Sequence, residues 1–406
     1  MMMMMMRKRR RIIELAVEEG EAPPRCWTPA APRWLPRIAS FENRKIMKAY
    51  VTFFITIMAG LSCFPSLAQS SSSETYTPHI YKPPTKEQRD KWLSELPENV
   101  ILSAPYTPYK DDELRSLNAT EDNVYRLASN AKRLGVNLVW VPGSMGQFQA
   151  LTVDERKLLL KLWVKAGKEL GIYVVAHVGS NCVQKSRELA MHAASVGANA
   201  IASVPPFYLF EPATTDANID NVLGFLREIS MAAPNLPFLY YHIVPNIFQN
   251  SVTEFLQEAY TKFPHLIGIK WVKMNYADWF SSVQQFNKTH ALLFAPEPKL
   301  ASFSLGPGRG VVLAEDFYAP TYLNMRKLYY TSFNIQDEAS AEQQWKYDAE
   351  AIFGKYGGTA AKRMVYEKFI GLDMGDSRRP LLPFLGEKDK LFNELETIGF
   401  FNHTIL

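Results

Sequence analysis

The chain has 406 residues, of which 47% are hydrophobic and 21% are charged. This balance is typical of a globular protein and excludes an intrinsically disordered one. Residues 1–68 hold eleven Lys and Arg against five Asp and Glu, so the net charge of +4 leaves the rest of the chain at about −2. We therefore expect no basic nucleic-acid-binding face and no nucleic acid as a partner.

The first 46 residues lack the sustained periodicity of a helix or strand, and we exclude them from the fold. From Met47, Lys48 is followed by an apolar run over 49–64 and by Ser66-Leu67-Ala68, the layout of a secretory signal peptide. The apolar run is shorter than the roughly 20 residues that span a bilayer, which favours cleavage. We expect a secreted protein with a signal peptide at about 47–68. Two alternatives stay open: a type II membrane anchor, and a cytoplasmic protein if the leader is an artefact of the reading frame.

Cys182 is the only cysteine after the expected cleavage point, so the mature chain can form no internal disulfide. A domain of this size does not need one. Sequons at Asn118, Asn287 and Asn402 fit a secreted protein. Residues 69–97, which include a run of four serines, predict a flexible leader with a short helix at 86–96.

From Asn99 onward, short apolar segments alternate with helical ones. Strands are expected at 100–106, 136–141, 172–178, 200–204, 236–245, 266–271, 291–295 and 310–314. The intervening helices are expected at 120–134, 152–170, up to 197, up to 233, 252–263 and 276–287, and the link at 301–308 is short and Gly-rich. Thr152 and Glu155 have the spacing of a capping box. Further helices are expected at 320–333, 340–356, 359–370 and 388–395.

Eight strand-helix units imply parallel pairing and favour a closed (β/α)8 TIM barrel, an α/β fold, over an open doubly wound sheet. The open sheet would carry a Gly-rich phosphate turn after its first strand, where this chain has residues 104–108, Ala-Pro-Tyr-Thr-Pro. We divide the chain into an N-terminal extension with the signal peptide (1–68), a leader (69–97), the barrel (98–318) and a C-terminal helical region (319–406).

Two of the strands carry a polar group near their C-terminal ends, Tyr241 on the fifth and Lys270 on the sixth. In a barrel these ends form the active-site face. A neutral amine in a dry site is a nucleophile toward carbonyl groups, and a neighbouring phenol can supply the proton transfers of imine chemistry. The two residues alone also allow a Lys that reaches solvent beside a Tyr of the core.

A Gly-Ser-x-Gly turn at 143–146 follows the second strand. The amide groups and the hydroxyl of Ser144 in such a turn can hold a carboxylate. The sequence has no His, Cys and Asp cluster with metal-ligand spacing, so we expect neither a metal nor a cofactor. The other strand ends contribute Thr107, His177, Ser180, Phe207, Tyr208, Glu297, Glu315 and Asp316.

These motifs resemble those of the class I pyruvate aldolases, the family that includes dihydrodipicolinate synthase and N-acetylneuraminate lyase, over residues 99–381. Within it the pattern most resembles animal N-acetylneuraminate lyases, at 177–179, 239–243, 268–270 and 375–381. The resemblance implies that Lys270 forms an imine with a 2-oxo acid, that Tyr241 shuttles protons and that Gly143 and Ser144 start the loop for the pyruvate carboxylate. It also implies a homotetramer, with Tyr208 near a subunit contact.

The chain departs from the family pattern where the substrate is bound. Met145 and Gln147 stand where the family carries a hydroxyl residue and a Glu, and Val272 and Ala314 stand where it carries hydroxyl residues. Glu297 keeps one member of an acidic pair. Each lost hydrogen bond costs about 0.5–1.5 kcal/mol, so we expect weaker binding of a polyhydroxylated tail.

The leading hypothesis is therefore a Schiff-base aldolase that cleaves a sialic-acid-type 2-oxo acid to pyruvate and an amino-sugar aldehyde. Two alternatives stay open at this point. One is a pyruvate aldolase for another, less polar aldehyde. The other is a secreted non-catalytic protein that keeps the barrel as a binding module.

Overall fold

The structure is a computed structural model that describes residues 81–206, 215–243, 251–272, 275–295, 308–331 and 335–403. All of them belong to one compact unit, Thr77–Leu406. The expected signal peptide, Tyr208 and Glu297 lie outside the described residues. Within the described part, no helix is both long and apolar enough to span a bilayer.

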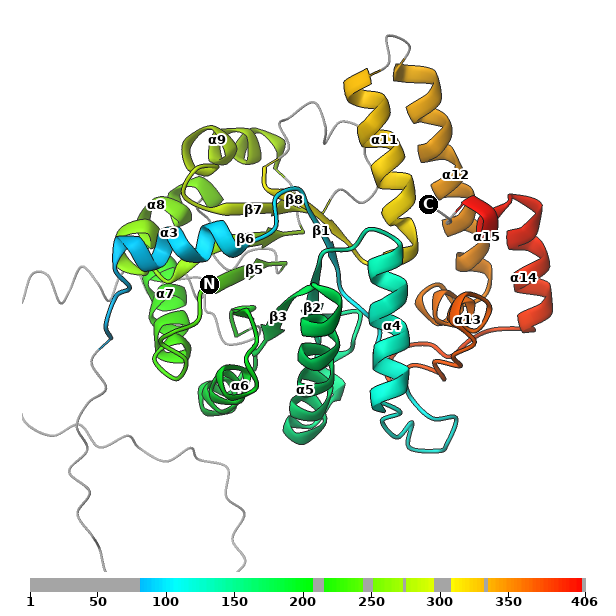
Figure 1. The fold of residues 1–406 in the computed structure, drawn as a ribbon, viewed down its shortest axis with the longest axis horizontal. Coiled ribbons are helices and arrows are strands. Elements are labelled where there is room, and N and C mark those ends of the chain that lie inside the picture. The colour runs from blue at the N-terminus through cyan, green and yellow to red at the C-terminus, as the bar shows by residue number, and fades with distance from the viewer. Residues whose placement is uncertain are drawn as a thin grey trace, which may run out of the picture. The chain divides into compact units, whose positions relative to one another are not determined.

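Eight parallel strands close into a barrel in chain order, and β1 pairs with both β2 and β8 (Figure 1). The (β/α)8 barrel predicted from the alternation of elements is confirmed, and each strand lies within its predicted range. The strands are β1 (Val100–Ser103), β2 (Leu138–Val141), β3 (Tyr173–His177), β4 (Ala200–Ser203), β5 (Phe238–His242), β6 (Leu266–Trp271), β7 (Ala291–Phe294) and β8 (Gly310–Leu313).

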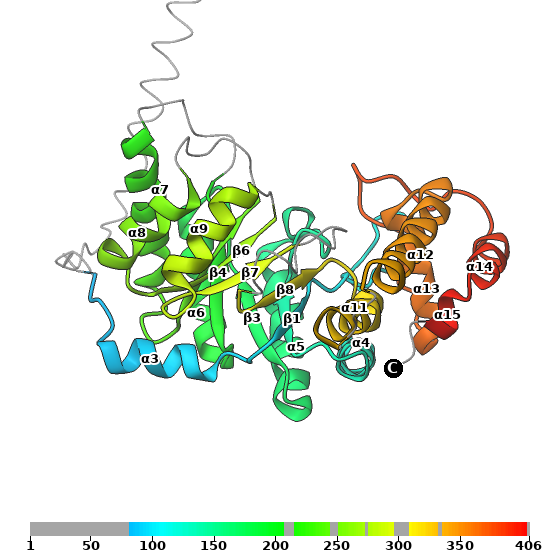
Figure 2. The same cartoon turned by 90° about the horizontal axis from the view of Figure 1, so that it is seen from above.

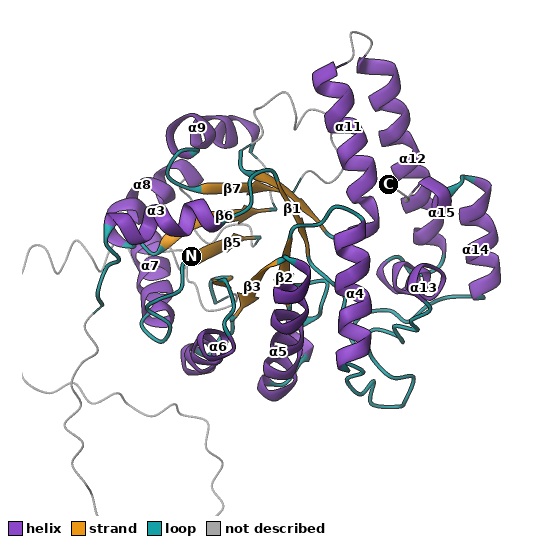
Figure 3. Ribbon diagram, viewed as in Figure 1, coloured by secondary structure: helices purple, strands orange, loops and turns teal. Residues whose placement is uncertain are grey.

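Helices surround the barrel, as Figure 3 shows. α5 begins with the predicted capping box, in which Glu155 N–H donates to the Thr152 hydroxyl and Thr152 N–H donates to the Glu155 carboxylate. The helices that follow strands are α4 (Glu121–Arg133), α5 (Val153–Leu170), α6 (Val183–Val196), α7 (Thr215–Ser230), α8 (Val252–Lys262), α9 (Tyr276–Phe286) and, after the turn η3 (Asp316–Tyr318), α11 (Ala319–Thr331).

The C-terminal helices gather on one side of the barrel (Figure 2). They are α12 (Ile335–Lys355), α13 (Thr359–Ile370), α14 (Lys388–Thr397) and α15 (Phe400–His403). α12 starts before the predicted residue 340, and α15 was not predicted. α13 packs against α4, which brings the C-terminal region next to the first strand-helix unit of the barrel.

The side chains of each strand point alternately into the barrel and toward the surrounding helices, which gives the protein two apolar cores. On β5, Leu239 and Tyr241 face the barrel interior, whereas Phe238 and Tyr240 face the helices. Successive side chains of a strand point to opposite sides, so a strand that is buried on both faces reads as a continuous apolar run. A polar residue in such a run, such as Lys270 on β6, is therefore held inside the fold.

The helix expected at 86–96 forms as α3 (Lys86–Glu95), but it is docked on the barrel rather than part of a flexible leader. It lies beside β6 (Figure 1), and Trp92 is buried in the interior core. The buried Arg89 guanidinium donates to the carbonyls of Pro264 and Leu266 at the start of β6, at 2.6 and 2.7 Å. A third bond reaches the Thr289 carbonyl, just before β7, at 2.6 Å. α3 thus closes the end of the barrel where the strands begin.

Replacing Arg89 with Met is expected to lower the free energy of unfolding by about 2–4 kcal/mol, because it leaves buried carbonyls without donors. The measurement is the urea midpoint of unfolding. The matched control is Lys91→Met on the same helix, since Lys91 is exposed and pairs with the exposed Glu95. Equal midpoints for the two variants would contradict the role of Arg89.

Candidate active site

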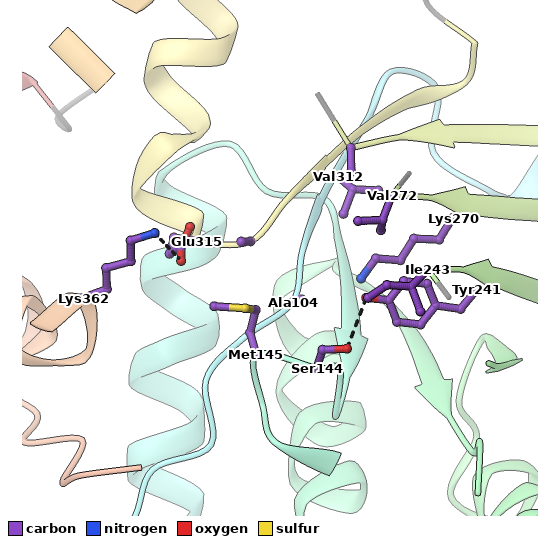
Figure 4. A pocket seen from close by; sticks show the side chains of 12 residues that line it. Ala104, Ser144, Met145, Tyr241, Ile243, Lys270, Val272, Val312, Glu315 and Lys362 are labelled. Atoms are coloured by element: carbon purple, nitrogen blue, oxygen red, sulfur yellow. Dashed lines mark hydrogen bonds and ion pairs between the residues drawn. The ribbon is translucent and has the colours of Figure 1, made fainter. Parts of the chain in front are cut away.

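Lys270 and Tyr241 lie side by side at the C-terminal ends of β6 and β5, where they are paired in the strand register. Both side chains line one pocket of about 310 Å³ (Figure 4). The Lys270 Nζ lies 4.3 Å from the centre of the Tyr241 ring and 5.0 Å from that of Trp140. The sequence placed both groups at the mouth of the barrel, and the structure brings them into contact.

Lys270 is 2% exposed, and none of the described carboxylates pairs with its amine. Burial therefore dominates its chemistry and lowers the pKa of Lys270 from its ordinary value to about 7. The two aromatic faces favour the ammonium form, but they do not outweigh the loss of hydration. A large fraction of Lys270 is thus a neutral amine near neutral pH, which is the form that attacks a carbonyl.

The Tyr241 hydroxyl lies 3.2 Å from the Ser144 Oγ, and either oxygen can donate this hydrogen bond. Burial raises the pKa of Tyr241, and the bond from Ser144 opposes part of that rise. The phenol therefore stays protonated at neutral pH. Ser144 follows β2 and Tyr241 lies near the end of β5, so this bond links two sides of the barrel mouth. The two hydroxyl groups together can relay a proton.

The turn after β2 presents Ser144 and Met145 to the pocket, whereas Gly143, which the resemblance placed at the substrate carboxylate, is not among the lining residues. The buried Thr107 hydroxyl donates to the Gly146 carbonyl at 2.7 Å and fixes the turn from the β1 side. A Cβ on Gly146 would approach the Pro105 carbonyl oxygen to 3.0 Å, which explains the glycine. The thioether of Met145 offers no strong donor where the resemblance led us to expect a hydroxyl.

Gln147, at the position where the family carries a Glu, does not line the pocket. Its side chain is buried, donates to the Arg378 carbonyl at 2.9 Å and accepts from the Arg378 N–H at 3.2 Å. The Arg378 guanidinium in turn bonds Glu155 at the start of α5, at 2.6 Å. The substitution therefore ties the turn to the C-terminal segment.

The pocket wall that leads away from Lys270, Tyr241 and Ser144 is apolar. Val272 and Ala314 line it, as expected from the sequence, and they are joined by residues that sequence reasoning missed: Ala104, Ile243, Ala295 and Val312. Small and branched side chains at the ends of buried strands carry no distinctive signal, so their place in a site emerges only from the closed barrel.

A charged pair lies at the other end of the pocket: Glu315 was placed at this face of the barrel from the sequence, but Lys362 was missed. Lys362 on α13 forms an ion pair with Glu315, which follows β8, at 3.2 Å between Nζ and Oε1. Asp316, the neighbour of Glu315, does not line the pocket and bonds Asn130 at 3.1 Å. Among the described residues, no group of three His, Cys, Asp or Glu side chains is placed to hold a metal ion.

Residues 98–397 match the Dihydrodipicolinate synthetase family. The chain belongs to this family. N-acetylneuraminate lyase of Rattus norvegicus is 32% identical over 257 residues, which cover 62% of this chain and 77% of that protein. The Homo sapiens N-acetylneuraminate lyase is 30% identical over 283 residues, 68% of this chain and 85% of that protein. N-acetylneuraminate lyase of Proteus mirabilis shares the fold, with a TM-score of 0.67 at 22% identity over 75% of this chain and 99% of that one.

In this member of the dihydrodipicolinate synthetase family, the rate of imine formation is expected to rise about tenfold per pH unit below pH 7 and to level off above it. The reason is that only the neutral Lys270 amine attacks, and its pKa is lowered to about 7. The measurement is the initial rate of pyruvate trapping with cyanoborohydride between pH 5 and 9. A rate that still climbs steeply at pH 9 would show an amine of ordinary pKa and contradict the burial argument.

Proposed function

We propose that this protein is a class I aldolase that cleaves N-acetylneuraminate-type 2-oxo acids to pyruvate and an N-acetylated amino-sugar aldehyde. The observation that carries the proposal is the buried Lys270, whose lowered pKa leaves a nucleophile beside the bonded pair Tyr241 and Ser144. Similarity to N-acetylneuraminate lyases that are about 30% identical supports the substrate class.

The residues support a complete sequence of steps. The Lys270 Nζ attacks the C2 ketone of the open-chain substrate, and loss of water gives a protonated imine. Removal of the proton from the C4 hydroxyl breaks the C3–C4 bond, the electron pair moves into the imine, and the aldehyde departs. Protonation of the resulting enamine at C3 and addition of water release pyruvate and restore the amine. Tyr241, relayed by Ser144, is the group placed to move these protons.

The alternatives are less favoured. A non-catalytic module has no need for a buried amine that none of the described carboxylates neutralises, because burial of such an amine costs stability. The similarity to the rat and human proteins, which are both N-acetylneuraminate lyases, favours an amino-sugar aldehyde over another aldehyde as the second product. The apolar residues Val272 and Ala314 in the pocket wall affect how the sugar tail is bound, not whether the imine forms.

The test of the proposal is borohydride reduction with pyruvate, followed by peptide mass analysis, together with an assay of pyruvate release from N-acetylneuraminate. We expect one pyruvyl adduct on Lys270 and measurable cleavage. No adduct at saturating pyruvate would overturn the proposal, because every step above passes through that imine.

We further propose that the protein is secreted and tetrameric. The signal-peptide layout at 47–68 supports secretion, and the resemblance to the family supports the tetramer. The sequon residues Asn287 and Asn402 are exposed, which is compatible with passage through the secretory pathway. N-terminal sequencing of the secreted protein and light scattering check these two points, and an intact segment from Met47 or a monomer would contradict them.

A further inference from the structure

The two ends of the pocket differ in their chemistry. Lys270, Tyr241 and Ser144 stand at the reacting end, and the wall beyond them is apolar. Across the pocket, Figure 4 shows Glu315 and Lys362 facing each other, with Met145 between them and the reacting end. Among the described lining residues, this pair holds the hydrogen-bonding groups that are remote from the imine.

The pair is held in place by a network of mostly buried side chains, of which Glu350 is partly exposed. Glu315 is 1% exposed and accepts a hydrogen bond from the Tyr106 hydroxyl at 2.8 Å. The Lys362 side chain is 12% exposed and also pairs with Glu350 of α12 at 2.8 Å. Glu350 accepts from the Tyr318 hydroxyl at 2.8 Å. Such preorganised groups bind a ligand at a smaller entropic cost than mobile surface side chains.

The charges of this network indicate which ligand group it suits. Two carboxyl groups face one amine, so the network does not favour an anion. A hydroxyl group both donates and accepts, so it can donate to a carboxylate such as Glu315 while it accepts from an ammonium such as Lys362. Neighbouring hydroxyls on one chain can engage both partners at once. The far end of the pocket is therefore suited to a neutral, hydroxylated tail.

We propose that Glu315 and Lys362 bind hydroxyl groups at the far end of the substrate and so replace the hydrogen-bonding residues lost at Val272 and Ala314. This inference rests on the proposed function, because it assigns the tail of the same substrate. It makes the C-terminal helix α13 part of the specificity of the site, whereas the imine and its proton path come from the barrel alone.

The experiment compares Glu315→Gln, Lys362→Met and the double variant with two substrates. One is N-acetylneuraminate, and the other is 4-hydroxy-2-oxopentanoate, which yields pyruvate and acetaldehyde and has no hydroxylated tail. We expect kcat/KM for N-acetylneuraminate to fall roughly ten- to a hundredfold, mainly through KM, and that for the short substrate to stay unchanged. Each single variant leaves one charge of the ion pair without its partner and can fail to fold. The double variant removes both charges, so it still tests the inference in that case.

Glu367→Gln and Lys368→Met are matched controls on the same helix, because these residues pair with exposed partners away from the pocket. Pyruvate trapping on Lys270 is followed in every variant. A protein that traps pyruvate but loses no preference for N-acetylneuraminate in the pair variants overturns the inference alone. An unmodified protein that traps pyruvate but cleaves only the short substrate overturns the inference together with the substrate class of the proposed function. A protein that traps no pyruvate in its unmodified form overturns the proposed function and the inference with it.

Discussion

Replacing Lys270 with Met is expected to abolish the pyruvate adduct and to lower N-acetylneuraminate cleavage by at least about a thousandfold. Met keeps the length of the apolar stem and removes only the nucleophile. No described carboxylate pairs with Lys270, so the substitution leaves no partner charge exposed to the apolar interior. We therefore expect a folded protein of equal or greater thermal stability, in which the loss of activity reports on chemistry rather than on the fold.

The measurement is the mass of the borohydride-reduced protein with pyruvate, followed by peptide mapping. Mapping matters because Lys362 is a second lysine that lines the pocket. Its amine is paired with Glu315 and Glu350, which favours the charged and unreactive form. Lys262→Met, which removes an exposed lysine of α8, is the control and should keep full activity. An adduct on Lys362 in the Lys270→Met variant would contradict the assignment of the imine to Lys270.

The barrel and its reacting end could be predicted because they depend on local patterns. Short apolar runs separated by capped helices determine the alternation, and Lys270 is conspicuous because it is a charged residue within such a run. The C-terminal ends of parallel strands meet on one face, so Tyr241 and Lys270 were bound to be neighbours once the order of the strands was known.

The rest of the site could not be predicted, because it depends on packing between distant segments. Nothing in the sequence of α13 distinguishes Lys362 as a site residue. Lys362 reaches Glu315 only because α13 packs beside α4. The resemblance marked Gln147 as a departure from the family pattern, but its bond to Arg378, far along the chain, could not be predicted from the sequence. α3 was correctly predicted as a helix, but the carbonyls that Arg89 binds belong to segments far along the chain.

The hydroxyl of Tyr241 is expected to matter almost as much as the amine of Lys270. Replacing Tyr241 with Phe should lower kcat for N-acetylneuraminate by about 10²–10⁴-fold, the range in which a positioned general acid or base acts. Burial raises the pKa of Tyr241, so the phenol is protonated at neutral pH and can donate to the departing hydroxyl during imine formation. To accept a proton from the C4 hydroxyl it must pass its own to Ser144, whose Oγ lies 3.2 Å away.

A structural role for Tyr241 would give a different result, and the neighbouring tyrosine provides the comparison. Tyr240→Phe removes a hydroxyl from the same strand on the side that packs against Phe255, with ring centres 4.7 Å apart. We expect this control to keep its kcat. In Tyr241→Phe we expect KM to change little and the pyruvate adduct still to form on Lys270, more slowly, because the amine stays buried over Trp140. Equal losses in the two variants would indicate a packing effect, and an unchanged kcat in Tyr241→Phe would remove the phenol from the proton path.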